Sequence, residues 1–145
     1  MSRQIHILFL CVANSARSQI AEGLAKKIFG DTANIASAGS VPSGKVQPLA
    51  VEVLKEEQID ISENWSKSIE QLPHNFLNRL EYVITLCGEE VCPVLPSAAK
   101  RIHWPMPDPV SVDETQKLDA FRQVRNHIRE NLLAFQNEII IPSDN

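Results

Sequence analysis

The chain has 145 residues, of which 43% are hydrophobic and 22% charged, and its formal net charge at pH 7 is −4. This length fits one globular domain over residues 1–145 with a polar tail at about 142–145, and the negative net charge argues against nucleic-acid binding. Because no stretch reaches the ~20 apolar residues of a membrane span and the start lacks a signal-peptide pattern, we expect a cytoplasmic, monomeric protein without a membrane partner.

Four apolar segments have the residue content of β-strands and alternate with helical patterns. These predicted strands are residues 5–11, 34–38, 82–86 and 101–104. In the first helical segment Ile20, Leu24 and Ile28 recur every four residues, and Gly30 is a suitable stop. A second helix is expected to begin near Pro48.

The last helix has the clearest apolar periodicity. Its expected buried residues are Leu118, Phe121, Val124, Ile128, Leu132 and Phe135. The pattern runs on until Pro142, which cannot continue a helix. Strands alternating with helices predict an α/β fold, a four-stranded parallel sheet with helices on both faces. Ligands of such sheets bind at the carboxyl ends of the strands.

At the end of the first predicted strand, Cys11 and Arg17 lie in a loop that leads into a helix, and five residues separate them. Backbone N–H groups of such a loop and the helix dipole attract an anion and favour the thiolate form of Cys11. Arg17 offers a planar fork that can hold two oxygens of a phosphate-like ion. The expected oxyanion-binding residues are Val12, Ala13, Asn14, Ser15, Ala16, Arg17 and Ser18, and residues 11–18 are called the Cys11 loop below.

A buried, unreactive thiol is the alternative for Cys11 considered alone. The small polar residues of the loop favour the anion cradle, because they can hydrogen-bond the backbone or the sulfur and leave room for an anion. The loop is not a nucleotide P-loop, since the glycines and the Lys-Ser/Thr pair are missing.

Cys87 and Cys92 follow the third predicted strand. A zinc site would need further ligands, and the nearest candidate, His103, stands alone, so no metal is expected. Unreactive core thiols remain an alternative, whereas a structural disulfide is unusual in the cytosol. A transient redox pair is favoured. A helical connection would leave the two Cα atoms roughly 8 to 9 Å apart, so we expect the loop to change shape when the pair is oxidised.

Asp108 lies between two prolines after the fourth predicted strand, in Met106-Pro107-Asp108-Pro109. A carboxyl group held on a stiff segment at the same sheet edge suits a general acid that protonates a leaving oxygen. The alternative is that Asp-Pro only caps a turn.

With these motifs the chain resembles arsenate reductases of the thioredoxin-coupled class, which have the low-molecular-weight protein tyrosine phosphatase fold. The resemblance spans nearly the whole chain. It is carried by residues 11–23, Ser37-Ala38-Gly39, residues 59–62, Thr85-Leu86-Cys87, residues 92–96, His103-Trp104, Asp108-Pro109 and residues 121–125. The cysteine pair and Gln19, where such phosphatases usually have proline, distinguish the reductases.

The resemblance implies a three-cysteine relay that reduces arsenate to arsenite without a cofactor. Cys11 attacks arsenic while Arg17 and the loop amides hold the oxygens and Asp108 protonates the leaving hydroxide. Cys87 then attacks Cys11, arsenite leaves, and Cys92 attacks Cys87 to form a second disulfide. Four residues separate the pair, fewer than in the thioredoxin-coupled class and more than in glutaredoxin-coupled relatives, and thioredoxin rather than glutaredoxin is expected as the reductant.

Some relatives bind potassium beside this loop, and Asn14, Glu22 and Ser37 match positions that supply ligands there. The remaining acidic position corresponds to Lys67, whose ammonium could replace the cation and pair with Glu22. We therefore expect no potassium dependence. The alternative is that Lys67 is an ordinary surface lysine.

Two other functions stay open at this point. A phosphomonoesterase, such as a low-molecular-weight protein tyrosine phosphatase, would need only Cys11, Arg17 and Asp108. A phosphotyrosine pocket also needs aromatic walls, and Tyr82, Trp65 and Trp104 are better explained as core residues. A non-catalytic redox or oxyanion sensor is the third possibility, for which Arg17 and Asp108 would be superfluous.

Overall fold

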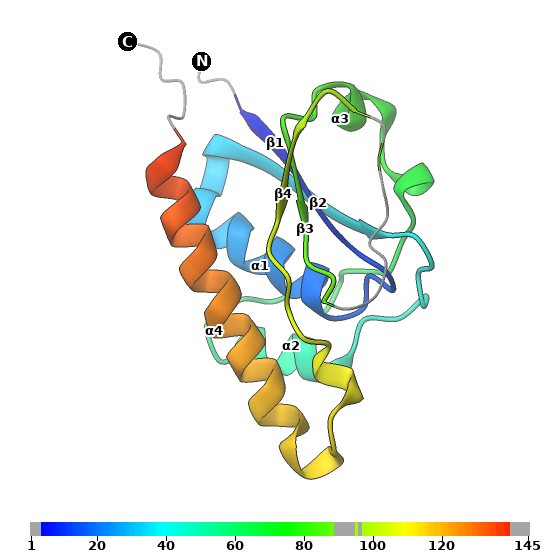
Figure 1. The fold of residues 1–145 in the computed structure, drawn as a ribbon, viewed down its shortest axis with the longest axis vertical. Coiled ribbons are helices and arrows are strands. Elements are labelled where there is room, and N and C mark those ends of the chain that lie inside the picture. The colour runs from blue at the N-terminus through cyan, green and yellow to red at the C-terminus, as the bar shows by residue number, and fades with distance from the viewer. Residues whose placement is uncertain (1–3, 89–94, 96, 140–145) are drawn as a thin grey trace.

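The computed structural model of the protein describes residues 4–88, 95 and 97–139 (Figure 1). In chain order the helices and strands are β1 (Ile5–Cys11), α1 (Arg17–Phe29), β2 (Ala33–Gly39), α2 (Pro48–Lys55), α3 (His74–Asn78), β3 (Tyr82–Thr85), β4 (Lys100–His103) and α4 (Glu114–Glu138). Short 3-10 turns occur at Gly30–Thr32, Ile69–Gln71 and Pro109–Ser111. All four predicted strands are present, and each boundary differs from the prediction by one residue at most.

The four strands form one parallel sheet in the order β2-β1-β3-β4, which confirms the predicted sheet. The register aligns Cys11 with Gly39, Leu10 with Thr85, and Thr85 with His103. The carboxyl ends of all four strands therefore meet at one edge. The segments that follow β1, β3 and β4 begin there.

Helices cover both faces of the sheet, as predicted. α1, α2 and α4 pack on the face that carries Ile7, Phe9 and Ile84, and they enclose the larger core. A smaller core forms on the opposite face, where α3 contributes Phe76 against Leu8. Because β1 is buried on both faces, its sequence is continuously apolar rather than alternating.

The helix ends differ in part from the prediction. α1 ends before Gly30, whose positive φ of 55° favours glycine, as expected. α4 ends at Glu138, four residues before Pro142, so the proline does not stop it. Pro142 and the predicted polar tail at 142–145 lie outside the described residues.

The aromatic residues assigned to the core are only partly there. Tyr82 and Trp104 both pack edge-on against Phe135 of α4, with ring centroids 5.1 and 6.0 Å apart. Trp65 is 51% exposed, so its assignment to the core was wrong. The residues that follow it contact the Cys11 loop, through the side chain of Ser66 and the backbone N–H of Lys67.

Ion pairs tie α4 to the end of α2. Arg122 donates to both carboxylate oxygens of Glu56, and Arg125 donates to Glu56 Oε1 at 2.6 Å. Hydrogen bonds from Arg122 and then Arg125 lower the pKa of Glu56 to about 2. We therefore expect acid to weaken this contact between α2 and α4.

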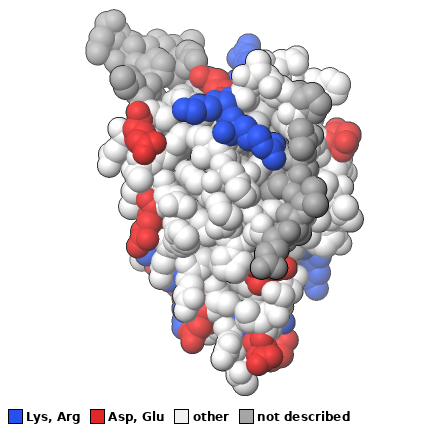
Figure 2. Space-filling model, viewed as in Figure 1, with Lys and Arg blue, Asp and Glu red and all other residues white. Residues whose placement is uncertain are grey.

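Charged side chains are spread unevenly over the face shown in Figure 2. On β4, Lys100 and Arg101 are exposed and form the blue area in the upper part of that view, while acidic groups are scattered around it. Among the described residues, no helix combines the length and apolarity that crossing a membrane requires.

Candidate active site

A pocket of about 220 Å³ opens at the carboxyl edge of the sheet. Its walls come from the Cys11 loop, from the segment between β2 and α2, and from the segment after β4. The lining residues are Cys11, Ala13, Ser15, Ala16, Arg17, Ser43, Gln47, Asp108 and Val110. Three of the residues predicted for catalysis, Cys11, Arg17 and Asp108, thus face one cavity.

The Cys11 loop is anchored through its carbonyl groups. The carbonyl oxygens of Val12, Ala13 and Ser15 accept backbone hydrogen bonds of 2.9, 3.0 and 2.8 Å from residues 41, 43 and 47. In a trans peptide the N–H points opposite to the C=O, so these bonds direct the following N–H groups to the other side of the loop. Such inward N–H groups are suited to an anion.

Gly39 allows the loop to lie this close to β2. A Cβ atom on residue 39 would be 2.3 Å from the carbonyl oxygen of Val12 and 3.0 Å from the nitrogen of Asn14. Both neighbours are backbone atoms that cannot rotate away. Residue 39 must therefore be glycine for this loop conformation.

Hydrogen bonds fix the orientation of the Asn14 side-chain amide. The backbone N–H of Lys67 can only donate, and it donates to Asn14 Oδ1 at 3.0 Å. The amide nitrogen therefore faces the other way and donates to Ser18 Oγ at 2.7 Å and Ser37 Oγ at 3.0 Å. Asn14 has a positive φ of 50°, a conformation that asparagine adopts more readily than most residues.

Ser18 Oγ lies 2.9 Å from Cys11 Sγ, and either atom can be the donor in this contact. When Cys11 is a thiolate its sulfur can only accept, so the Ser18 hydroxyl, which accepts from Asn14, then donates to the sulfur. A hydrogen bond of this kind stabilises a thiolate. Ser37 Oγ likewise donates to Glu22 Oε1 at 2.6 Å.

Arg17 connects the Cys11 loop to the segments that follow β3 and β4. It is 5% exposed, and its Nη1 donates to the carbonyl oxygen of Met106 at 3.0 Å and more weakly to that of Leu86 at 3.5 Å. Leu86 follows β3 and Met106 follows β4. The guanidinium is therefore held in place before any anion arrives.

Asp108 lies at the start of the 3-10 turn that follows β4. Its Oδ1 accepts from the backbone N–H of Val110 at 3.0 Å, and its carbonyl accepts from Ser111 Oγ at 2.9 Å. The turn-capping role considered for Asp108 is thus present. It is compatible with the acid role, since the half-buried residue also lines the pocket.

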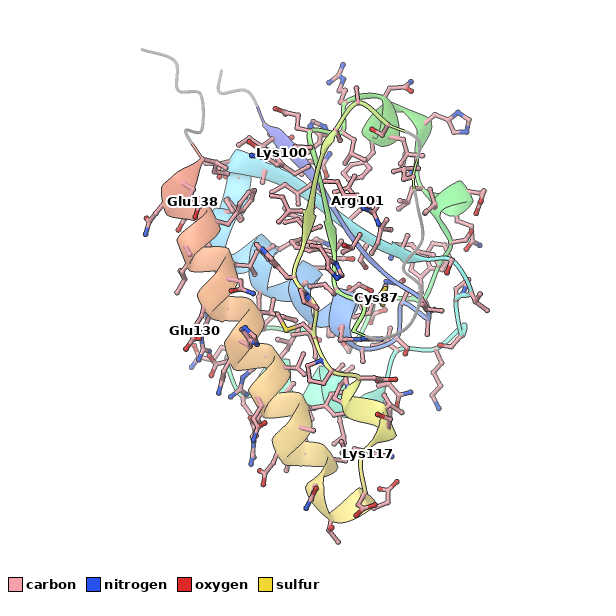
Figure 3. The ribbon with its side chains drawn as sticks, in the orientation of Figure 1. Cys87, Lys100, Arg101, Lys117, Glu130 and Glu138 are labelled. Atoms are coloured by element: carbon pink, nitrogen blue, oxygen red, sulfur yellow. The ribbon has the colours of Figure 1, made fainter. Side chains whose placement is uncertain are left out.

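The predicted relay cysteines are only partly described. Cys87 is 1% exposed at the carboxyl end of β3 and is disulfide-bonded, whereas Cys11 is a free thiol. Figure 3 shows Cys87 at that end, with Lys100 and Arg101 toward the other end of β4. Cys92 and the loop predicted to change shape, residues 89–94, lie outside the described residues. Cys87 does not line the pocket above Cys11.

Lys67 is buried beside Glu22. It is 7% exposed, and its Nζ lies 3.9 Å from Glu22 Oε1 and 3.2 Å from the carbonyl oxygen of Trp65. The surface-lysine alternative was therefore wrong, and the predicted pairing with Glu22 is present. Burial lowers the pKa of Lys67, and the nearby Glu22 carboxylate opposes that shift. With an ammonium at this position, the residues do not fit a potassium ion.

Several residues of the site were not assigned a structural role by the sequence. Gln19 is fully buried and contacts Asn14, Trp65 and Asn64. Ser66 Oγ donates to the carbonyl oxygen of Ala13 at 2.9 Å. No spacing signal marks residues 64–67 as neighbours of the Cys11 loop, because they come 45 or more residues later. In the part of the chain that the structure describes, no group of three or more His, Cys, Asp or Glu could hold a metal ion.

Comparison with known proteins gives matches over almost the whole chain. A family model described as low molecular weight phosphotyrosine protein phosphatase matches residues 6–140. An arsenate reductase from Halalkalibacterium halodurans is 44% identical over 133 residues, covering 89% of this chain and 93% of that protein.

Solved structures agree with this match. One described as an arsenate reductase in the phosphate binding state has a TM-score of 0.77 and 32% identity, covering 94% of this chain and 100% of that chain. A thioredoxin-dependent arsenate reductase from Corynebacterium glutamicum has a TM-score of 0.69 and 30% identity, covering 95% of this chain and 65% of that chain.

Proposed function

The chain belongs to the low molecular weight phosphotyrosine protein phosphatase family, and on that premise we propose that it reduces arsenate to arsenite through Cys11, Cys87 and Cys92, with thioredoxin as the reductant. The observation that carries the proposal is the pocket shared by Cys11, Arg17 and Asp108. Its size suits a small tetrahedral oxyanion.

The first step uses the residues of that pocket. The Cys11 thiolate, stabilised by the Ser18 hydroxyl, attacks arsenic to form a sulfur–arsenic bond. Arg17 and the N–H groups of the Cys11 loop stabilise the negative charge on the oxygens. Asp108 gives its proton to the departing hydroxide, which leaves as water.

The second step transfers two electrons. Cys87 attacks the sulfur of Cys11, the sulfur–arsenic bond breaks with its electron pair on arsenic, and arsenic(V) becomes arsenic(III). Cys92 then attacks Cys87, which releases the Cys11 thiolate. A free Cys11 with a disulfide-bonded Cys87 is the distribution expected at the end of this relay. The dithiol of thioredoxin returns the enzyme to its starting state.

Two lines of evidence bear on the reductant and the location. The name of the Corynebacterium glutamicum neighbour supports thioredoxin. A relay through transient disulfides requires a compartment in which thiols are kept reduced, so we place the protein in the cytoplasm.

Hydrolysis of phosphomonoesters is the second candidate, because Cys11, Arg17 and Asp108 suffice for it. The described walls of the pocket contain no aromatic ring. A phosphotyrosine ring would therefore find no stacking partner there, which favours small oxyanions over phosphotyrosine. Weak hydrolysis of aryl phosphates is the expected side activity.

The decisive experiment is arsenate-dependent NADPH oxidation with thioredoxin and thioredoxin reductase. The unmodified protein should sustain NADPH oxidation when arsenate is present. Neither Cys87→Ser nor Cys92→Ser should sustain it. Hydrolysis of an aryl phosphate by the same two variants is the internal control and should persist. Turnover only with a glutaredoxin system would overturn the choice of reductant. No arsenate turnover with either system, together with hydrolysis by Cys87→Ser, would identify a phosphatase instead.

A further inference from the structure

Gln19 joins the Cys11 loop to a distant segment of the chain. It lies in the first turn of α1, has 0% exposed surface, and reaches residues 64–65 as well as Asn14. Neither the anion cradle nor the cysteine relay uses its side chain directly. A fully buried amide with this many contacts needs an explanation.

The contacts of Gln19 determine which way its amide points. Its Nε2 donates to the carbonyl oxygens of Trp65 at 3.1 Å and Asn14 at 3.2 Å, which can only accept. On the other side, Oε1 accepts from Asn64 Nδ2 at 3.0 Å. The side chain is therefore fixed at both ends.

The same nitrogen also lies 3.0 Å from Asn14 Oδ1, so one of its two protons is shared between the carbonyl oxygen and Oδ1 of Asn14. Gln19 thus holds Asn14 by its backbone and by its side chain, at a residue whose positive φ is otherwise unfavourable. With Oδ1 held, the Asn14 nitrogen faces Ser18 and donates to its Oγ, which leaves the Ser18 proton able to donate to a Cys11 thiolate.

From this chain of contacts we propose that Gln19 is a positioning residue for the nucleophile: together with the Lys67 N–H, it holds Asn14 in the orientation in which Ser18 Oγ accepts from Asn14 and can donate to the Cys11 thiolate. The inference deepens the proposed arsenate reduction and rests on it for its biological meaning. Its direct consequence, the reactivity of Cys11, can be measured without arsenate.

The test replaces Gln19 by methionine, which has a similar length but neither donates through nitrogen nor fixes Asn14. Iodoacetamide alkylation of Cys11 is followed by mass spectrometry of its peptide from pH 5 to 9. We expect alkylation near neutral pH to slow roughly threefold to tenfold and its pH profile to move upward, as for partial loss of a hydrogen bond to a charged group.

Gln136→Met is the matched control, because Gln136 also donates to a backbone carbonyl, that of Ile28, but lies on α4. It should alkylate like the unmodified protein. Protection of Cys11 by inorganic phosphate should change less than twofold in Gln19→Met, since Arg17 and the loop carbonyl anchors remain. Alkylation at the original rate, or loss of phosphate protection in parallel with reactivity, would overturn the proposal.

Asn64→Ala is the second variant if Gln19→Met does not fold. It removes only the bond to Gln19 Oε1 and a weak contact to Glu22, and it should slow alkylation about twofold. An unchanged rate of Cys11 alkylation in Asn64→Ala would count against the positioning role of Gln19. Failure of the unmodified protein to reduce arsenate would refute the proposed function but leave these alkylation results interpretable.

Discussion

Arg17 donates a 3.0 Å hydrogen bond from Nη1 to the carbonyl oxygen of Met106, two residues before Asp108. This bond connects the helix that carries Arg17, the proposed anion-binding residue, to the segment that carries Asp108, the proposed acid. Because Arg17 is also buried, its guanidinium cannot swing away from the pocket. The position of each group therefore depends on the other.

Arg17→Lys should lose most of the activity. A lysine ammonium keeps the charge but cannot hold two oxygens and the Met106 carbonyl in one plane, so kcat/KM for arsenate should fall by about 100-fold or more. The coupled NADPH assay measures this. Arg122→Lys, on the exposed side of α4, is the control and should stay within twofold. Activity of Arg17→Lys within threefold of the original would contradict the assigned role.

Asp108→Asn separates the acid role from the turn-capping role. The asparagine oxygen can still accept from the Val110 N–H, so the segment should keep its shape, but no acidic proton is available. Hydrolysis of an aryl phosphate with a poor leaving group should fall by roughly 10²- to 10³-fold. A substrate with a good leaving group should be affected much less.

Asp113→Asn, at the exposed start of α4, serves as the comparison for that measurement and should behave like the original protein. An equal loss with both leaving groups in Asp108→Asn would show that the carboxyl group positions the segment without donating a proton.

Lys67→Asp should introduce a potassium response. The unmodified protein should react at equal rates in sodium and potassium chloride of the same ionic strength, because the Lys67 ammonium already lies near Glu22. With aspartate at residue 67 two carboxylates face one another, and a cation is needed between them. The rate of Lys67→Asp should therefore rise with potassium. Lys27→Asp, at an exposed site on α1, should show no such effect, and potassium stimulation of the unmodified protein would refute the idea.

Glu56→Gln should reduce the acid sensitivity of folding. The pKa of Glu56 is about 2 in the folded protein, below its usual 4.5, so the folded state binds fewer protons. Its stabilising contribution is complete above about pH 4.5 and is lost as the pH falls toward 2. Urea denaturation at pH 7 and at pH 3 measures the difference between the free energies of unfolding at the two pH values.

That difference should be smaller in Glu56→Gln than in the original protein or in Glu70→Gln, an exposed glutamate away from α4. High salt should also reduce this pH dependence of stability, because Glu56 and Arg122 are accessible to solvent. Identical pH dependence in Glu56→Gln and the original protein would mean that this carboxylate does not contribute.

Some parts of the fold follow from local chemistry alone. The apolar runs of β1 and β3, the period of α1 and the break at Gly30 all reflect constraints within a few residues. The end of α4 at Glu138 was not predicted, because the apolar period of the sequence continues beyond it. The exposed position of Trp65 was not predicted for a similar reason, since sequence patterns measure how apolar a residue is and not where the chain turns.

Local patterns were enough to predict the sheet, the loop from Cys11 to Ser18 and the candidate acid Asp108, because loop-to-helix transitions and paired prolines leave local signals. The contacts by which Gln19 and residues 64–67 hold Asn14, and the burial of Lys67 against Glu22, became apparent in the folded chain alone. Gln19 and Asn14 are five positions apart, but the contacts of residues 64–67 with Asn14 and Gln19, and that of Lys67 with Glu22, join residues 45 to 53 positions apart. Hydrogen-bond partners at such separation are chosen by how the elements pack together, which a single sequence does not encode in any spacing.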